Sequence, residues 1–209
     1  MNKGIIFDLD GTLWDSSENV VKSWNEVLAK RADRTISIAD MQSYMGKTLE
    51  KIGELVLPDV PAELRQDIMK EACDNENAYL RKHGGKLFPE LEAVLQKLSE
   101  RYRLFIVSNC QDGYIEVFLE YYGLGKYFAD TECPGRSGLE KAGNIRLVVE
   151  RNGLDKAVYV GDTQGDCDSA EAAGVQFIHA AYGFGEIDHS VPKVDSLVEL
   201  LSVVEEFLE

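Results

Sequence analysis

The chain has 209 residues, and 37 Asp and Glu against 22 Lys and Arg give it a formal net charge of -15. No cluster of basic residues is present to neutralise a phosphate backbone, so we expect no nucleic-acid binding. Hydrophobic residues make up 44% of the sequence, and no apolar run is long enough for a signal sequence or a membrane span. We therefore expect a folded cytoplasmic protein.

The first predicted strand is a short apolar run over residues 5–7. Asp8 and Asp10 follow it directly, and the next glycine permits a loop. Asp15 resembles the first residue of a capping box, and apolar residues then recur with helical spacing. This pattern predicts a helix over about 16–30.

The stretch from about 35 to 85 keeps a helical pattern and contains no convincing strand. It stands between the first and second strands of the main domain, so we expect it to be a helical insertion. The predicted division is a helical cap domain over residues 15–85 and a core domain over residues 1–14 and 86–209.

The remainder of the chain alternates between strand and helix patterns. Strands are predicted at 103–107, 127–132, 157–160 and 175–180, and helices at about 89–98, 112–122, 141–152 and 197–208. Such alternation predicts an α/β fold with a parallel sheet that helices cover on both faces.

Polar residues gather where the predicted strands end. They are Asp8, Asp10, Ser108, Asn109, Asp162 and Asp166. Open parallel sheets bind ligands outside the carboxyl ends of their strands, so four carboxylates are expected at one rim. They repel one another unless a divalent cation lies among them, and oxygen ligands favour a hard ion such as Mg²⁺. The sequence therefore predicts a magnesium site.

The chain also carries four short motifs in order. They are Asp8-Leu9-Asp10-Gly11-Thr12, Ser108, Lys141, and Gly161-Asp162 with Asp166. Together they resemble the four motifs of the haloacid dehalogenase superfamily, in its phosphoglycolate-phosphatase-like branch. The resemblance covers residues 5 to about 174 and implies a Rossmann-like parallel core with an inserted helical cap. It further implies a magnesium-dependent phosphatase that hydrolyses a small phosphorylated metabolite through an aspartyl-phosphate.

The resemblance gives the acidic residues separate roles. It implies that Asp8 is the nucleophile and also touches the metal. Asp10 protonates the leaving oxygen, later activates water, and offers its backbone carbonyl to Mg²⁺. Asp162 and Asp166 complete the metal site, directly or through water.

The phosphoryl oxygens need neutralising contacts in such a reaction. The resemblance assigns these contacts to Ser108, to the Lys141 ammonium and to backbone N–H groups near Gly11 and Thr12. Asn109 is expected to contact the substrate or to shape the loop.

Three assignments have structural alternatives. Many relatives place a proline directly after the motif lysine, but alanine follows Lys141, so the alternatives are a surface lysine and Arg136 as the cation. Trp14 either forms a wall of the cavity or packs at the cap hinge. Lys47, in a Gly-Lys-Thr run that resembles a cap loop, either meets a second anionic group of the substrate or is a solvated helix-end lysine.

Other activities on the same scaffold differ in their acids. A haloacid dehalogenase or a phosphonatase lacks an acid at the position of Asp10, which argues against both. A beta-phosphoglucomutase-like phosphotransferase keeps the same motifs and stays open, as does a non-catalytic binding domain that retains the fold. Phosphoglycolate, a sugar phosphate, a nucleoside monophosphate and pyrophosphate are all compatible substrates.

The cysteines and histidines predict no further chemistry. No CxxC pair occurs, and His83, His179 and His189 lie too far apart in the sequence for a zinc signature. No arginine follows any cysteine at the sixth position, which excludes a cysteine-based phosphatase loop. Cys110 and Cys167 flank the motifs, and we expect them to be reduced and inert.

Overall fold

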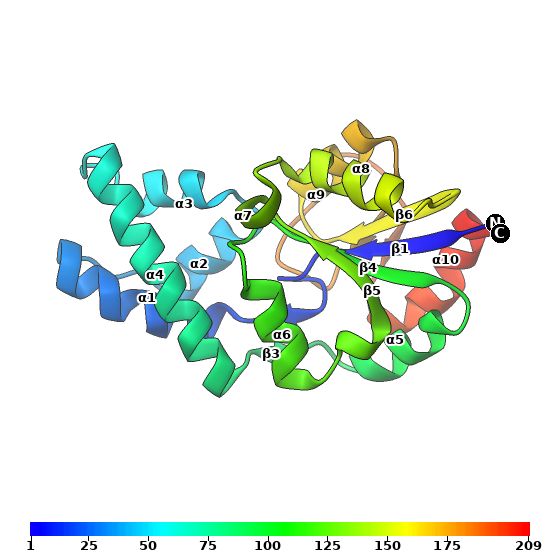
Figure 1. Cartoon of the computed structure of the whole chain (residues 1–209), viewed down its shortest axis with the longest axis horizontal. Coiled ribbons are helices and arrows are strands. Elements are labelled where there is room, and N and C mark those ends of the chain that lie inside the picture. The colour runs from blue at the N-terminus through cyan, green and yellow to red at the C-terminus, as the bar shows by residue number, and fades with distance from the viewer.

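The computed structural model describes all 209 residues and contains a six-stranded sheet in the order β5-β4-β1-β6-β7-β8. Every neighbouring pair is parallel, and β1 lies between β4 and β6 (Figure 1). The strands are β1 Lys3–Phe7, β4 Arg103–Val107, β5 Phe128–Glu132, β6 Lys156–Gly161, β7 Gln176–Ala180 and β8 Lys193–Val194. The predicted α/β fold with a parallel sheet is confirmed.

Helices cover both faces of this sheet because successive strand side chains point to opposite sides. On one face, Ile6 of β1 belongs to an apolar cluster with Ile145 of α8 (Lys141–Arg151) and Ala170 of α9 (Gln164–Ala173). On the other, Ile5 belongs to a cluster with residues of α5 (Leu91–Ser99) and α10 (Leu200–Leu208). The remaining short elements on this part of the chain are α6 Tyr114–Tyr122, η1 Gly125–Tyr127, α7 Pro134–Ser137 and η2 Leu197–Glu199. None of the helices combines the length and apolar content that a membrane crossing needs.

Four helices lie beyond the carboxyl ends of the strands, at the left of Figure 1. They are α1 Ser17–Ala32, α2 Ile38–Tyr44, α3 Leu49–Val56 and α4 Ala62–His83. The long helices α1 and α4 pack side by side, and Asn75 Nδ2 donates a hydrogen bond across them to Ser23 O over 2.8 Å. These helices therefore stand over the rim where the sheet presents its loops.

The chain enters and leaves these helices through a two-stranded antiparallel ribbon. Its strands are β2 Trp14–Asp15 and β3 Lys86–Leu87. The ribbon was not predicted, because two residues are too short for an alternating pattern to be recognised. The predicted domain boundaries at residues 15 and 85 fall on it, and the division into core and cap stays a prediction.

Two predictions about how helices begin are wrong, although α1 starts within one residue of the predicted position. Helix α1 has Ser16 as its N-cap, and Asp15 Oδ1 instead accepts hydrogen bonds from the backbone N–H and the hydroxyl of Ser17, so no capping box forms at Asp15. Helix α5 begins at Leu91 and not in the turn that contains Pro89, because Glu90 before it takes a left-handed backbone conformation with φ of 62°.

Trp14 is fully buried in the ribbon and packs at the hinge. Its ring meets the rings of Tyr114, Phe118 and Tyr122 in edge-on arrangements, with centroids 5.1 to 6.3 Å apart. Of the two roles considered for Trp14, packing at the hinge is therefore the one that the structure shows. Such aromatic clusters contribute dispersion and burial together.

We expect Trp14→Ala to lower the free energy of unfolding by about 3–5 kcal/mol, because it leaves a large cavity among three aromatic rings. Tyr121, an exposed aromatic residue of α6, provides the control, and Tyr121→Ala is expected to cost less than half as much. Urea unfolding of the three proteins measures both changes. Equal losses would contradict a central packing role for Trp14.

Candidate active site

The loop after β1 is built to bring Asp8 close to Asp162. Asp8 is buried, and its backbone N–H donates to Val160 O over 2.8 Å, which continues the pairing of β1 with β6. Gly11 has φ of 80°, and a Cβ there would lie 2.2 Å from Asp162 Oδ2. Only glycine allows both this conformation and this approach. The loop thus places the two carboxylates at the ends of adjacent strands.

Asp166, at the start of α9, joins them. One oxygen of each of Asp8, Asp162 and Asp166 lies within 4.8 Å of the others, and all three side chains are buried. Lys141 Nζ, also buried, lies 3.1 Å from Asp8 Oδ1 and 2.5 Å from Asp166 Oδ1. One ammonium therefore contacts two of three neighbouring carboxylates, which leaves an excess of negative charge if all three are ionised.

Burial and mutual repulsion raise the pKa values of Asp8 and Asp162. The pKa of Asp8 is raised to about 7, first by burial and then by the neighbouring Asp166, while Lys141 acts in the opposite direction. The pKa of Asp162 is also raised well above its usual range, first by burial and then by Asp166 and Asp8. Burial lowers the pKa of Lys141, but the neighbouring Asp166 and Asp8 outweigh this effect, so it stays above its ordinary value. An all-oxygen set with this repulsion fits a hard divalent cation.

Asp10 is held by two hydroxyls that the sequence analysis missed. Its Oδ1 accepts hydrogen bonds of 2.8 Å from Ser16 Oγ and from Tyr114 OH. Burial raises the pKa of Asp10 to about 6, although Ser16 and Tyr114 lower it. A carboxyl group that titrates near neutral pH suits proton transfer. Nothing in the sequence links Tyr114 to a residue 104 positions away.

Ser108 and Asn109 follow β4 and line the same cavity as Asp8 and Asp10. The cavity lies between the sheet rim and the four N-terminal helices and has a volume of about 50 Å³, which is room for a few water molecules. Asn109 Nδ2 donates to Gly46 O over 2.9 Å, so this asparagine joins the rim to the loop between α2 and α3.

Lys47 lines this cavity as well, but its ammonium donates to Ser43 O at 2.5 Å within its own segment. The alternative cation, Arg136, forms ion pairs with Asp112 and Glu116 instead of reaching the carboxylates. Lys141 is therefore the cation that the fold brings to Asp8.

The backbone N–H groups of Gly11 and Thr12 donate hydrogen bonds to backbone carbonyls of the same segment. Gly11 N donates to Trp14 O over 2.9 Å, and Thr12 N donates to Leu9 O over 3.3 Å. The phosphate contact predicted for amides near Gly11 and Thr12 stays a prediction. The hydroxyl Oγ1 of Thr12 donates to Asp162 Oδ1 over 3.4 Å, which ties the loop to the carboxylate cluster.

The chain matches known proteins over most of its length. Residues 5–180 match the family model of the haloacid dehalogenase-like hydrolases. The chain belongs to this family. The sequence resemblance to the superfamily and the expectation of an enzyme are thereby confirmed.

The relatives of this hydrolase include named phosphatases. Phosphoglycolate phosphatase of Vibrio parahaemolyticus is 27% identical, and the match covers 97% of this chain and 96% of the relative. A haloacid dehalogenase-like hydrolase of Streptococcus pneumoniae has a TM-score of 0.84 at 21% identity, covering 97% of this chain and 98% of that one. CbbY from Rhodobacter sphaeroides, in complex with xylulose-(1,5)bisphosphate, has a TM-score of 0.80 at 20% identity, with 96% of each chain covered. The two structures show that the fold is shared.

Glu76 of α4 is a buried acid that the sequence analysis did not single out. It lines the cavity with Asp10, and one of its carboxylate oxygens accepts a hydrogen bond from Trp24 Nε1. Burial raises the pKa of Glu76 from 4.5 to about 8, and the bond from Trp24 opposes this shift. The hydrolase therefore holds Glu76 in its neutral form at neutral pH.

This shift predicts a pH dependence of stability. Between pH 4.5 and about 8 the folded protein keeps the proton of Glu76 and the unfolded chain loses it, so the free energy of unfolding falls as the pH rises. Because glutamine does not ionise, Glu76→Gln removes this fall in the free energy of unfolding. We expect the variant to lie within about 1 kcal/mol of the wild type at pH 5 and to exceed it by roughly 3–5 kcal/mol at pH 9.

Urea unfolding at a series of pH values measures the difference between the two proteins. Glu63, an exposed glutamate of the same helix, supplies the control, and Glu63→Gln should leave the wild-type pH profile unchanged. A difference between wild type and Glu76→Gln that is the same at pH 5 and pH 9 would contradict the neutral state of Glu76.

Proposed function

We propose that this protein is a magnesium-dependent phosphatase that hydrolyses a small phosphomonoester through an aspartyl-phosphate on Asp8. The proposal follows the phosphoglycolate phosphatases that the chain resembles in sequence. The observation that carries it is the buried contact of Lys141 with both Asp8 and Asp166 at the carboxyl rim of the sheet. Nucleophile, cation and metal ligands are thereby within reach of one phosphoryl group.

In the first step, a carboxylate oxygen of Asp8 attacks phosphorus and the bond from phosphorus to the ester oxygen breaks. Lys141 holds Oδ1 of Asp8, so Oδ2 is the oxygen that we assign to the attack. Asp10 gives its proton to the departing oxygen, and its pKa of about 6 leaves a usable protonated fraction near neutral pH. The alcohol then leaves, and phosphate stays on Asp8.

In the second step, a water molecule attacks the aspartyl-phosphate. Asp10, now a carboxylate, takes a proton from this water, and the bond from phosphorus to Asp8 breaks to release inorganic phosphate. Ser16 and Tyr114 hold the Asp10 side chain in one position through both steps. Ser108 and Lys141 are the groups that we assign to the phosphoryl oxygens.

We assign the magnesium site to the side chains of Asp8 and Asp162 and to the backbone carbonyl of Asp10. Magnesium, when bound, would neutralise phosphoryl charge. Both oxygens of Asp166 already accept hydrogen bonds: Oδ1 from Lys141, and Oδ2 from the backbone N–H and hydroxyl of Thr163. Asp166 is therefore assigned to the site through water and through its hold on Lys141.

Asp8→Asn should fold normally and lose phosphatase activity by a factor of at least about a thousand, because the covalent route is removed. Phosphate release from p-nitrophenyl phosphate and from a panel of phosphorylated metabolites measures this loss. Asp168 is an exposed acid of α9, and Asp168→Asn serves as the matched control with unchanged activity. Residual turnover of Asp8→Asn within tenfold of the wild type would rule out the nucleophile.

Removal of divalent cations by EDTA should abolish turnover, and Mg²⁺ should restore it. Millimolar Mg²⁺ should also raise the melting temperature, because the ion binds the folded carboxylate cluster and relieves its repulsion. Asp162→Asn should lose most of this thermal shift. Activity that resists EDTA, together with a melting temperature that ignores Mg²⁺, would contradict the metal assignment.

A further inference from the structure

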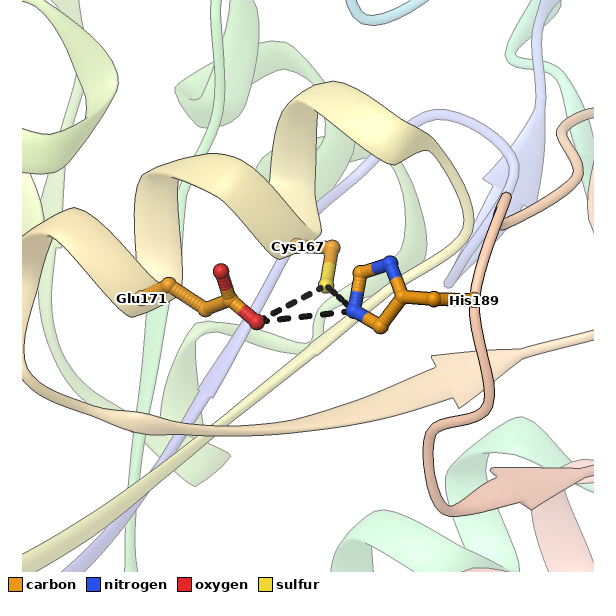
Figure 2. A group of neighbouring side chains, drawn as sticks. All are labelled: Cys167, Glu171 and His189. Atoms are coloured by element: carbon orange, nitrogen blue, oxygen red, sulfur yellow. Dashed lines mark hydrogen bonds and ion pairs between the residues drawn. The ribbon is translucent and has the colours of Figure 1, made fainter.

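Three potential metal ligands of different chemistry meet beside α9, between this helix and the segment that follows β7. Cys167 and Glu171 lie one turn apart on this helix, and His189 comes from the segment between β7 and β8 (Figure 2). Cys167 Sγ lies 3.8 Å from His189 Nε2 and 3.9 Å from Glu171 Oε1, and His189 Nε2 lies 3.5 Å from Glu171 Oε1. All three side chains point toward one common space, as Figure 2 shows.

These separations are close to those of a tetrahedral zinc site. Zinc bonds of about 2.3 Å to sulfur and about 2.0–2.2 Å to nitrogen and oxygen place neighbouring ligand atoms about 3.3–3.7 Å apart. The nitrogen–oxygen pair already lies in this range, and the two pairs with sulfur exceed it by a few tenths of an ångström. Small side-chain rotations would close that difference.

The histidine is also oriented as metal-binding histidines are. Asp188 Oδ1 lies 2.7 Å from His189 Nδ1, which places the proton on Nδ1 and leaves Nε2 with its lone pair toward Cys167 and Glu171. A carboxylate behind a ligating imidazole is the usual support for zinc binding. The side chains of Glu171 and His189 are 62% and 43% exposed, so water can reach a fourth position.

We propose that Cys167, Glu171 and His189 form a binding site for Zn²⁺, with water as the fourth ligand. When the ion binds, a bond forms from zinc to Sγ and the thiol proton passes to the solvent. The mixed sulfur, nitrogen and oxygen set selects a borderline-soft ion, whereas the all-oxygen set of Asp8 and Asp162 selects a hard one. The two sites thus take different ions.

Occupation of this site joins α9 to the segment after β7. The same segment already contacts one of the proposed magnesium ligands, because Phe184 N donates to Asp162 Oδ2 over 2.8 Å. A bound zinc ion therefore stabilises the folded protein without taking part in phosphoryl transfer. Its detection needs no phosphatase activity.

The first test is a titration with Co²⁺ in excess Mg²⁺, read by absorption. A thiolate ligand produces a sulfur-to-cobalt charge-transfer band that carboxylates cannot give, so binding at Asp8 and Asp162 stays silent. We expect the band to saturate at one equivalent and to disappear in Cys167→Ser. Cys73→Ser, which changes another buried free cysteine, should keep it. No band in the wild type, or a band that persists in Cys167→Ser, would overturn the proposal.

The second test uses surface variants, because Cys167→Ser changes a buried residue. Competition of Zn²⁺ with a chromophoric chelator should show at least tenfold weaker binding for His189→Ala and Glu171→Gln. Asp188→Asn should bind Zn²⁺ about 10- to 100-fold more weakly, because it removes the carboxylate that orients His189. His83→Ala, which removes an exposed histidine of α4, should bind as the wild type does. Equal affinities in all variants would contradict the zinc site and leave the cluster as a surface ion pair beside an unreactive thiol.

Discussion

Three buried carboxylates lie close to one another at the carboxyl rim of the sheet, and one lysine ammonium lies among them. Their mutual repulsion is the constraint that the other groups of the site must offset. The parallel pairing of β1 with β6 forces Asp8 and Asp162 together, and Gly11 leaves the space that their approach needs. Such a cluster is stable only when bound cations or protons offset its negative charge. The raised pKa values of Asp8 and Asp162 and the fit to a divalent cation therefore have the same cause.

The helices beyond the rim have a different part in this arrangement. They cover the cavity, where Asn109 Nδ2 of the rim donates a hydrogen bond to Gly46 O of the loop between α2 and α3, and they place Glu76 on the wall that also contains Asp10. The cavity has a volume of about 50 Å³, which is room for a few water molecules. We expect residues at the sheet rim to bind the phosphoryl group. Residues of the four helices and of their loops, including Lys47 between α2 and α3, are expected to determine which organic group is accepted.

The sequence best predicts features that depend on residues close together along the chain, such as a strand and the residue that follows it. Asp8 and Asp162 each follow an apolar strand directly, so their meeting at one rim follows from the rule for parallel sheets. The hydroxyls that hold Asp10 could not be found, since Tyr114 lies far along the chain and carries no motif. The same holds for the Cys167 cluster: Glu171 stands one helical turn away, but only the packing of a loop brings His189 to it.

Chemical capture of phosphate on Asp8 tests the central claim most directly. In Asp10→Asn, attack by Asp8 remains possible and water activation is lost, so a substrate with a good leaving group such as p-nitrophenyl phosphate should load the enzyme and stop. Rapid acid quenching, protease digestion and mass spectrometry then locate the modification. The account predicts one phosphoryl group on the peptide that contains Asp8, in an amount that approaches one per protein. Phosphate on another residue, or burst-free hydrolysis with no modified peptide, would contradict it.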